Sequence, residues 1–329
     1  MSEIQLGFGR DLINLAFDDS RFTVLTNDPQ HSHPLTDIEI GNALDTPVEG
    51  PTLDEIGSSG DSVLIIVSDG TRATASAQVV NLLVRRLIQY GISPSDIAII
   101  FATGIHRPVS PKEKAELLTP FIVQRVRVID HDAYDARQMV SLGTTDLGTP
   151  AQLNRALKDY STVIATGAVG FHYFAGFTGG RKSICPGLAS AQTIEATHML
   201  ALDFETGERR KGVDTARLSG NAVHEECERI AALVAPAFSI TTEVDERGRA
   251  QAEVGEQHGG RGHAHRRRAR FHGRLRALPL PVLRAELDLV RPRAADRRIF
   301  FVGATRRAAR SGSTTPSTSS TPSRCAPVT

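Results

Sequence analysis

Short apolar runs alternate with stretches of helical periodicity along the first part of the chain, and this alternation limits the fold more than any other feature. Residues 62–67 (SVLIIV) have the composition of a buried strand. Beyond a polar turn, residues 77–90 (AQVVNLLVRRLIQY) have the apolar spacing of an amphipathic helix. Together they predict one strand-loop-helix unit.

The same unit repeats in the next segment of the chain. Residues 96–101 (DIAIIF) predict a second strand, followed by the loop TGIHRPVS. A helix is expected to begin near Ser110, because Pro111 lies in its first turn and Glu113 completes a capping box with Ser110.

Two further apolar runs, at 122–129 and 162–166, predict more short strands. Buried strands that are separated by helices form a parallel sheet with helices on both faces, since each crossover between parallel strands is right-handed. We therefore predict the α/β class.

Composition excludes several classes of protein. The 329 residues are 40% hydrophobic, which is enough for a sizeable core and suggests two domains. A formal charge of +1 gives no reason to expect nucleic acid as a partner. The sequence has neither a signal peptide nor a membrane-spanning run, so we expect a cytoplasmic protein. Three scattered cysteines predict free thiols rather than a disulfide framework.

The composition changes sharply near residue 250. All five lysines lie at or before Lys211, whereas residues 251–329 are rich in arginine and end in a Ser/Thr/Pro tail. One interpretation is a basic low-complexity tail, which could bind nucleic acid. We favour a reading-frame shift, because GC-rich codons give arginine, alanine, proline and glycine when they are read out of frame. The predicted organisation is a folded domain at 1–245 and an aberrant tail at 246–329.

Unusual polar residues follow three of the predicted strands. Asp69 and Arg72 lie in the segment DGTR, His106 lies in GIHRP, and His172 follows the strand at 162–166. Ligands of open parallel sheets bind beyond the carboxyl ends of the strands, so these side chains are expected to share one site.

Histidine can accept and donate a proton at neutral pH. His106 and His172 could therefore serve as paired acid/base residues, could together hold a metal, or could be solvated loop residues. Asp69 and Arg72 could form an ion pair within their turn. Alternatively, Arg72 could clamp a carboxylate or phosphate.

A glycine-rich run, GFTGGRKS at 176–183, resembles a phosphate-binding loop but lacks the glycine that should precede the lysine. Gly179 and Gly180 would let backbone amides approach an anion, with positive charge from Arg181 and Lys182. Lys182 could also have a lowered pKa and act as a nucleophile, or be a solvated surface charge. His198, on a helix predicted at 189–200, could be a metal ligand or a helix-end residue.

These blocks, in this order, resemble the nickel-dependent lactate racemase family. Its distinguishing segments are similar to DGTR, GIHRP and the run from Gly170 to His198, and the resemblance covers roughly residues 7–243. It implies that Lys182 tethers a nickel-pincer nucleotide, that His198 ligates nickel, and that the acid/base pair is His106 and His172. Cofactor-binding roles are implied for Asp69, Arg72, Gly179, Gly180 and Arg181.

The resemblance also implies racemisation of a small 2-hydroxy acid, most simply lactate, and a dependence on cofactor-making proteins. Malate or another 2-hydroxy acid remains an alternative. The block GNAVHE at 220–225 resembles a family segment with a structural role. Family members carry a second α/β domain, and nothing after residue 251 resembles it. A truncated, inactive member is thus the non-enzymatic alternative.

Overall fold

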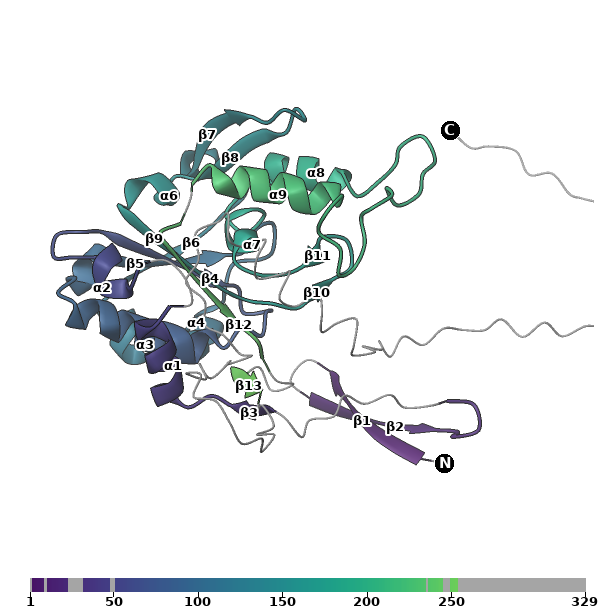
Figure 1. Cartoon of the computed structure of the whole chain (residues 1–329), viewed down its shortest axis with the longest axis horizontal. Helices are drawn as coiled ribbons and strands as arrows, with labels where there is room; N and C mark the ends of the chain where they lie inside the picture. The colour runs from purple at the N-terminus through teal and green to yellow at the C-terminus, as the bar shows by residue number, and fades with distance from the viewer. Residues whose placement is uncertain are drawn as a thin grey trace, which may run out of the picture. The chain divides into compact units, whose positions relative to one another are not determined.

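The computed structural model of the chain describes residues 2–8, 11–22, 32–47, 51–234, 236–244 and 249–253 (Figure 1). Nearly all of the tail predicted at 246–329, with its arginines and histidines, lies outside these residues. The described helices include none that is both long and apolar enough to cross a membrane.

A five-stranded parallel sheet forms the centre of the main unit, and this confirms the predicted α/β class. Its strand order is β12-β9-β4-β5-β6, and every neighbouring pair is parallel. The strands are β4 (Val63–Ser68), β5 (Ile97–Ala102), β6 (Arg127–Asp130), β9 (Thr162–Ala168) and β12 (Phe238–Thr242). The sheet order places β4 between β5 and β9, so the loops after these three strands emerge next to one another.

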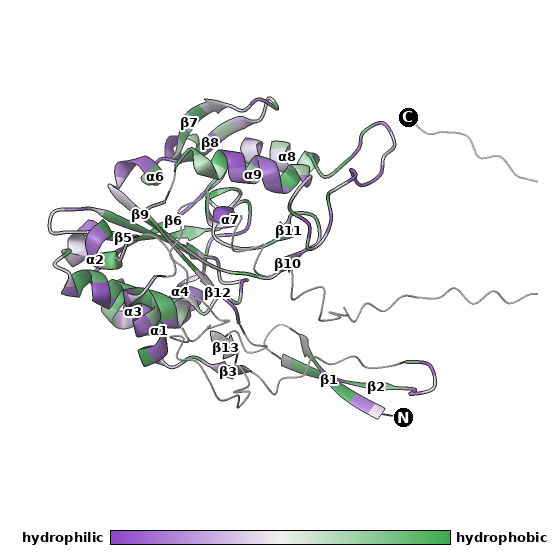
Figure 2. Cartoon of the chain, in the orientation of Figure 1, coloured by the Kyte–Doolittle hydropathy of each residue, from purple (hydrophilic) through white to green (hydrophobic). Residues whose placement is uncertain are grey.

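Helices cover both faces of this sheet. Alternate residues of β4 belong to two separate hydrophobic clusters: Val63, Ile65 and Val67 to one, Leu64 and Ile66 to the other. Figure 2 shows the central strands as the most hydrophobic part of the fold. The helices are α1 (Asp37–Asp45), α2 (Leu53–Ile56), α3 (Ser76–Gln89), α4 (Pro111–Leu117), α5 (Pro120–Val123), α6 (Ala156–Asp159), α7 (Arg181–Ile184), α8 (Ala191–Met199) and α9 (Ala222–Ala232).

The first cluster packs against α1 to α3 and α5, and the second packs against α6 to α9. Helix α3 turns Val79, Val80, Leu83, Val84 and Leu87 towards the sheet and leaves its other side polar, as the predicted amphipathic pattern requires. Burial of both sheet faces explains why β4 and β5 are almost entirely apolar.

The predicted start of the helix after β5 is confirmed. Ser110 caps α4, Pro111 occupies its first turn, and the Glu113 side chain accepts hydrogen bonds from the Ser110 backbone and hydroxyl. The strand predicted at 122–129 is wrong in its first half: Pro120 and the capping Thr119 start the short helix α5, and only Arg127–Asp130 forms a strand.

Four small antiparallel pairs complete the described secondary structure. They join β3 (Ser32–Pro34) to β13 (Gln251–Glu253), β7 (Met139–Thr144) to β8 (Pro150–Asn154), β10 (Phe171–His172) to β11 (Gly176–Phe177), and β1 (Ser2–Phe8) to β2 (Asp11–Phe17). Short 3-10 turns lie at Pro94–Asp96 and Ala136–Gln138. The β1–β2 hairpin belongs to a separate unit of the chain.

Candidate active site

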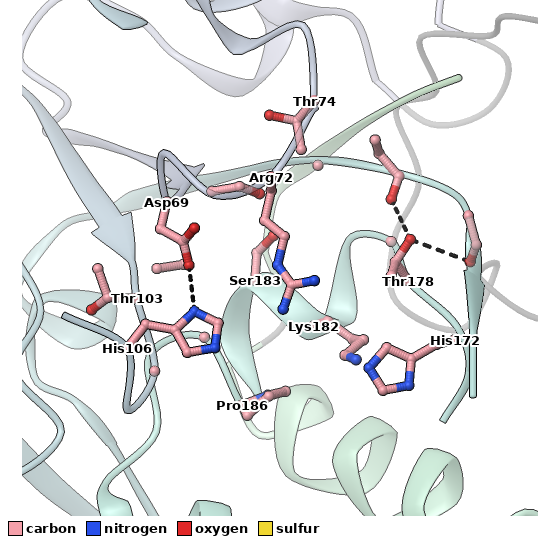
Figure 3. A pocket seen from close by; sticks show the side chains of 18 of the residues that line it. Asp69, Arg72, Thr74, Thr103, His106, His172, Thr178, Lys182, Ser183 and Pro186 are labelled. Carbon is pink, nitrogen blue, oxygen red and sulfur yellow. Dashed lines mark hydrogen bonds and ion pairs between the residues drawn. The ribbon is translucent and has the colours of Figure 1, made fainter. Parts of the chain in front are cut away.

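A cavity of about 340 Å³ lies at the carboxyl ends of β4, β5 and β9. This is where ligands of open parallel sheets bind, and the volume lies within the range of small-molecule sites. Seven of the nine predicted site residues line it (Figure 3). They are Asp69, Arg72, His106, His172, Gly179, Lys182 and His198.

Asp69 and His106 form a hydrogen-bonded pair at one side of the cavity. His106 Nδ1 lies 2.8 Å from Asp69 Oδ2, with 5% of the Asp69 side chain exposed and 45% of the His106 side chain. Burial alone would raise the pKa of Asp69, but hydrogen bonds from Thr71 and His106 outweigh it and lower the pKa. An ionised Asp69 accepts the Nδ1 proton of His106 and leaves Nε2 free to accept a proton.

Arg72 lies in the same loop as Asp69, and the ion pair considered between them does not form in the described part of the chain. The only contact between the two residues there is a backbone hydrogen bond from Arg72 N to Asp69 O. The Asp69 carboxylate instead bonds to Thr71 and His106. In Figure 3 the Arg72 guanidinium points into the cavity, between His106 and His172.

The loop that carries His106 is fastened to the start of α4. The Arg107 guanidinium donates to both oxygens of Glu113, at 2.8 and 2.6 Å. Hydrogen bonds from Arg107, and then from the Ser110 backbone, hold the pKa of Glu113 well below its ordinary value. A Cβ added at Gly70 would lie 3.0 Å from Glu113. Glu113 therefore packs against both loops, which explains the glycine in DGTR and the arginine in GIHRP.

Within the described part of the chain, His172 has no carboxylate partner like that of His106; aromatic rings surround it instead. It stacks on Tyr173 with ring centroids 5.0 Å apart and meets Phe174 edge-on at 4.5 Å. Its Nδ1 accepts a hydrogen bond from Ala175 N at 3.1 Å. Burial, followed by the nearby charges of Lys182 and Arg72, lowers the pKa of His172 to about 3. The ring is therefore neutral at physiological pH.

Lys182 lies in the first turn of α7. Burial lowers the pKa of its ammonium to about 7, with a smaller contribution from the charge of Arg181. Its Nζ lies 5.9 Å from the centre of the Phe174 ring. A large fraction of Lys182 is thus an uncharged, nucleophilic amine at neutral pH.

His198 lies in the last turn of α8 and faces the same cavity. Its ring meets Phe174 at a centroid distance of 5.1 Å, and Thr197 Oγ1 lies 3.3 Å from its Nδ1. Burial lowers the pKa of His198, and the charge of Lys182 adds to this effect. A neutral imidazole is the form that binds a metal.

Phe174 is a site residue that the sequence analysis missed, although it contacts His172, Lys182 and His198. Its carbonyl accepts a hydrogen bond of 2.9 Å from Asn221 Nδ2, and Asn221 also caps α9. The segment GNAVHE at 220–225 is therefore structural, as predicted, and it supports the aromatic side of the site. Only the position of Phe174 between His172 and Lys182 in the sequence could have indicated it.

Two predicted cofactor-binding residues do not line the cavity. Arg181 is 1% exposed, and its Nη2 donates to the carbonyls of Ala175 and Phe177. Its charge therefore holds the β10–β11 turn from inside the fold. Gly180 packs against β12, where an added Cβ would lie 2.6 Å from Ser239 Oγ. Its lack of a side chain serves close packing.

The cavity thus brings together three imidazoles, the amine of Lys182 and the guanidinium of Arg72. In the described ranges, no three His, Cys, Asp or Glu side chains gather closely enough to hold a metal by themselves.

The chain matches the family model described as the lactate racemase N-terminal domain over residues 8–208. It is 30% identical over 250 residues to a lactate racemase of Lactiplantibacillus plantarum, covering 75% of this chain and 57% of that protein. A lactate racemase of Thermoanaerobacterium thermosaccharolyticum is 27% identical over 248 residues, covering 74% of this chain and 57% of the relative.

Solved structures agree with these matches. The lactate racemase apoprotein of Thermoanaerobacterium thermosaccharolyticum superposes with a TM-score of 0.63 and 25% identity, covering 76% of this chain and 57% of that one. A Thermotoga maritima protein has the same fold, with a TM-score of 0.51 and 20% identity over 67% of this chain and 55% of that one. The chain thus spans a little over half the length of these relatives.

Proposed function

The chain belongs to the lactate racemase family, and on this premise we propose that it racemises a small 2-hydroxy acid, with lactate as the substrate. One observation carries the proposal: a single cavity collects His106, His172, Lys182 and His198. We propose 1–245 as the catalytic domain, and its activity as an enzyme of the cytoplasm.

His106 and His172 are the proposed acid/base pair. Inversion at one carbon requires a proton acceptor for each of two opposed orientations of the substrate hydroxyl. The hydrogen bond to Asp69 directs Nε2 of His106 into the cavity, and burial keeps the ring of His172 neutral. In each direction one histidine, neutral at the start, takes the hydroxyl proton of the substrate enantiomer, and the other, protonated at the start, donates a proton to the oxygen of the product enantiomer.

Arg72 is the proposed partner of the substrate or cofactor anion. Its guanidinium points into the cavity and has room for a two-point interaction with a carboxylate. An arginine so placed would fix the carboxylate and leave the hydroxyl and α-carbon between the two histidines. Malate shares this headgroup and is the alternative substrate.

A lysine-tethered nickel-pincer nucleotide is the cofactor we propose, made by dedicated biosynthesis proteins. Lys182 has the uncharged amine that covalent attachment needs, and His198 has the neutral ring that nickel needs. The lack of a three-residue metal cluster in the described residues suits a metal whose other donors belong to the nucleotide. Gly179 leaves space beside Lys182, since a Cβ there would meet nothing within 4 Å. When bound, this group would supply a reversible acceptor for the hydride of the α-carbon.

The test is lactate racemisation by the full chain, coexpressed with the cofactor-making proteins and assayed from each pure enantiomer. We expect both directions to proceed with lactate and to slow by at least about 10²-fold in a His172→Gln variant. A panel with malate identifies the alternative substrate. A cofactor-loaded chain that converts neither acid would contradict the proposal and leave an inactive family member.

A further inference from the structure

His131 is a buried, titratable residue that has no part in the chemistry described so far. It follows directly after β6, is 2% exposed and does not line the cavity. A buried histidine is costly to retain unless both of its ring nitrogens have partners. Its contacts therefore indicate what it does.

Both nitrogens of the His131 ring are hydrogen-bonded. Asn154 Nδ2 lies 3.0 Å from Nδ1, and Nε2 lies 3.1 Å from the carbonyl oxygen of Ala189. The Asn154 amide is oriented by two further bonds, from its Nδ2 to Gln138 Oε1 and to its Oδ1 from Ala156 N. Asn154 thus donates to Nδ1, so the Nε2 nitrogen carries the ring proton and donates to Ala189.

The main chain of His131 contacts the loop that carries His106. Its carbonyl accepts a hydrogen bond of 2.9 Å from Thr103 Oγ1, and Thr103 O accepts one from His106 N. Gly104, in the same loop, donates from its backbone to Gly187 O at 2.9 Å. The loop of His106 is therefore tied to His131.

Ala189 lies in the segment that connects Lys182 to His198. That segment leaves α7 through Gly187 and enters α8 at its capping residue Ser190. Ala191 N also donates to Ala133 O, two residues beyond His131. His131 thus holds the loop of His106 through its carbonyl, and it holds the segment between Lys182 and His198 through its ring.

We propose that His131 is a positioning residue that joins the two halves of the cavity and sets the separation of His106 from Lys182 and His198. Its neutral form is required, because a proton on Nδ1 would face the Asn154 amino group. The charged neighbour is Asp132, while Asn154, Gln138, Thr103 and Ala189 are uncharged. The catalytic role of His106 rests on the proposed function; the joining role of His131 does not.

Residue-resolved hydrogen exchange of the full chain tests the joining role. Three variants separate the two ring hydrogen bonds. His131→Leu removes both of them. His131→Gln retains the donor for Ala189 O, and His131→Asn retains the acceptor for Asn154 but loses the donor for Ala189. In His131→Leu and His131→Asn we expect protection of the Gly104 and Ala191 amides to fall by roughly tenfold. Protection in β4 and β5 should stay within about threefold, and His131→Gln should match the wild type.

A uniform loss of protection across β4, β5, Gly104 and Ala191 would overturn the proposal, because it would show only a stabilising role. Equal protection in His131→Gln and His131→Asn would overturn it too. If His131→Leu does not fold, the Gln and Asn pair decides the result. Racemisation by the loaded chain is a separate measurement: a wild type that does not racemise contradicts the proposed function, while exchange still decides the role of His131.

Discussion

The two sides of the cavity hold their polar side chains by different interactions. On the side of β4 and β5, the exposed His106 is held by the carboxylate of Asp69, and its loop is held by the pair of Arg107 and Glu113. On the side of the 171–198 segment, the charged Arg181 bonds to backbone carbonyls rather than to the side chains of His172 or Lys182. There burial and aromatic contacts set the protonation of His172 and Lys182.

The difference gives the two proposed acid/base histidines distinct surroundings. The Nδ1 of His106 contacts a carboxylate, whereas burial lowers the pKa of His172 and favours its neutral form. The two sides also respond differently to mutation: hydrogen bonds are lost one at a time, whereas loss of an aromatic side chain admits water to several groups.

The largest expected effect comes from the two histidines themselves. His106→Gln and His172→Gln should each lower lactate racemisation by about 10²- to 10⁴-fold, since each removes one proton acceptor. The measurement is the initial rate from each pure enantiomer, with adduct mass on Lys182 as the control for cofactor loading. A loaded variant that retains wild-type rates in both directions would remove that histidine from the mechanism.

His131 should make the stability of the fold sensitive to acid. Burial lowers the pKa of His131 to about 4, so the unfolded chain binds a proton near pH 6.5 that the folded chain does not. The free energy of unfolding should therefore fall between pH 6.5 and 4, by on the order of 3 kcal/mol from this group. Urea titrations at several pH values measure it. His131→Gln should lack this part of the slope, and an unchanged slope would contradict the assignment.

Removing the charge partner of His106 should have a smaller effect on rate. Asp69→Asn keeps the size of the side chain but loses the negative charge of the carboxylate that holds the Nδ1 side of the His106 ring. We expect the rate of racemisation to fall by roughly tenfold to a hundredfold. Thr71→Val, which removes a hydrogen bond from the opposite oxygen of Asp69, is the matched control and should lose less. An equal loss in both variants would point to loop distortion instead.

Removing the aromatic contact on the other side should change a pKa more than a rate. Phe174→Leu admits water to Lys182, which should raise the pKa of the lysine from about 7 by on the order of one unit. The pH dependence of Lys182 acylation, followed by peptide mass spectrometry, measures this shift. Phe171→Leu, at the Phe171–Phe177 contact in the same hairpin, is the control. If both variants acylate Lys182 with the wild-type midpoint, Phe174 does not exclude water.

The sequence predicted the parts of the fold that depend on local pattern. The strands at 62–67 and 96–101, the helix at 77–90 and the cap at Ser110 follow from periodicity and capping chemistry, and the structure confirms them. The run at 122–129 was misassigned because apolar periodicity does not distinguish a short helix from a strand when a proline at the helix start is overlooked.

The site was predictable where residues follow strand ends, and less so where packing decides. His106 and His172 lie at the same cavity because parallel strands end at one edge of the sheet. Arg181 and Lys182 are adjacent in a sequence that suggests two exposed cations, yet α7 directs Arg181 into the core and Lys182 to the cavity. The contacts of Phe174, Asn221 and His131 depend on segments far apart in the chain, which no local pattern reveals.

Attachment of the proposed cofactor to Lys182 can be measured by peptide mass spectrometry of the chain coexpressed with the cofactor-making proteins. We expect an added mass on the peptide that contains Lys182 and none on the peptides with Lys158 or Lys211. We also expect Lys182→Ala to abolish the adduct while the protein remains folded. An unmodified Lys182, or an adduct that persists in Lys182→Ala, would contradict this attachment.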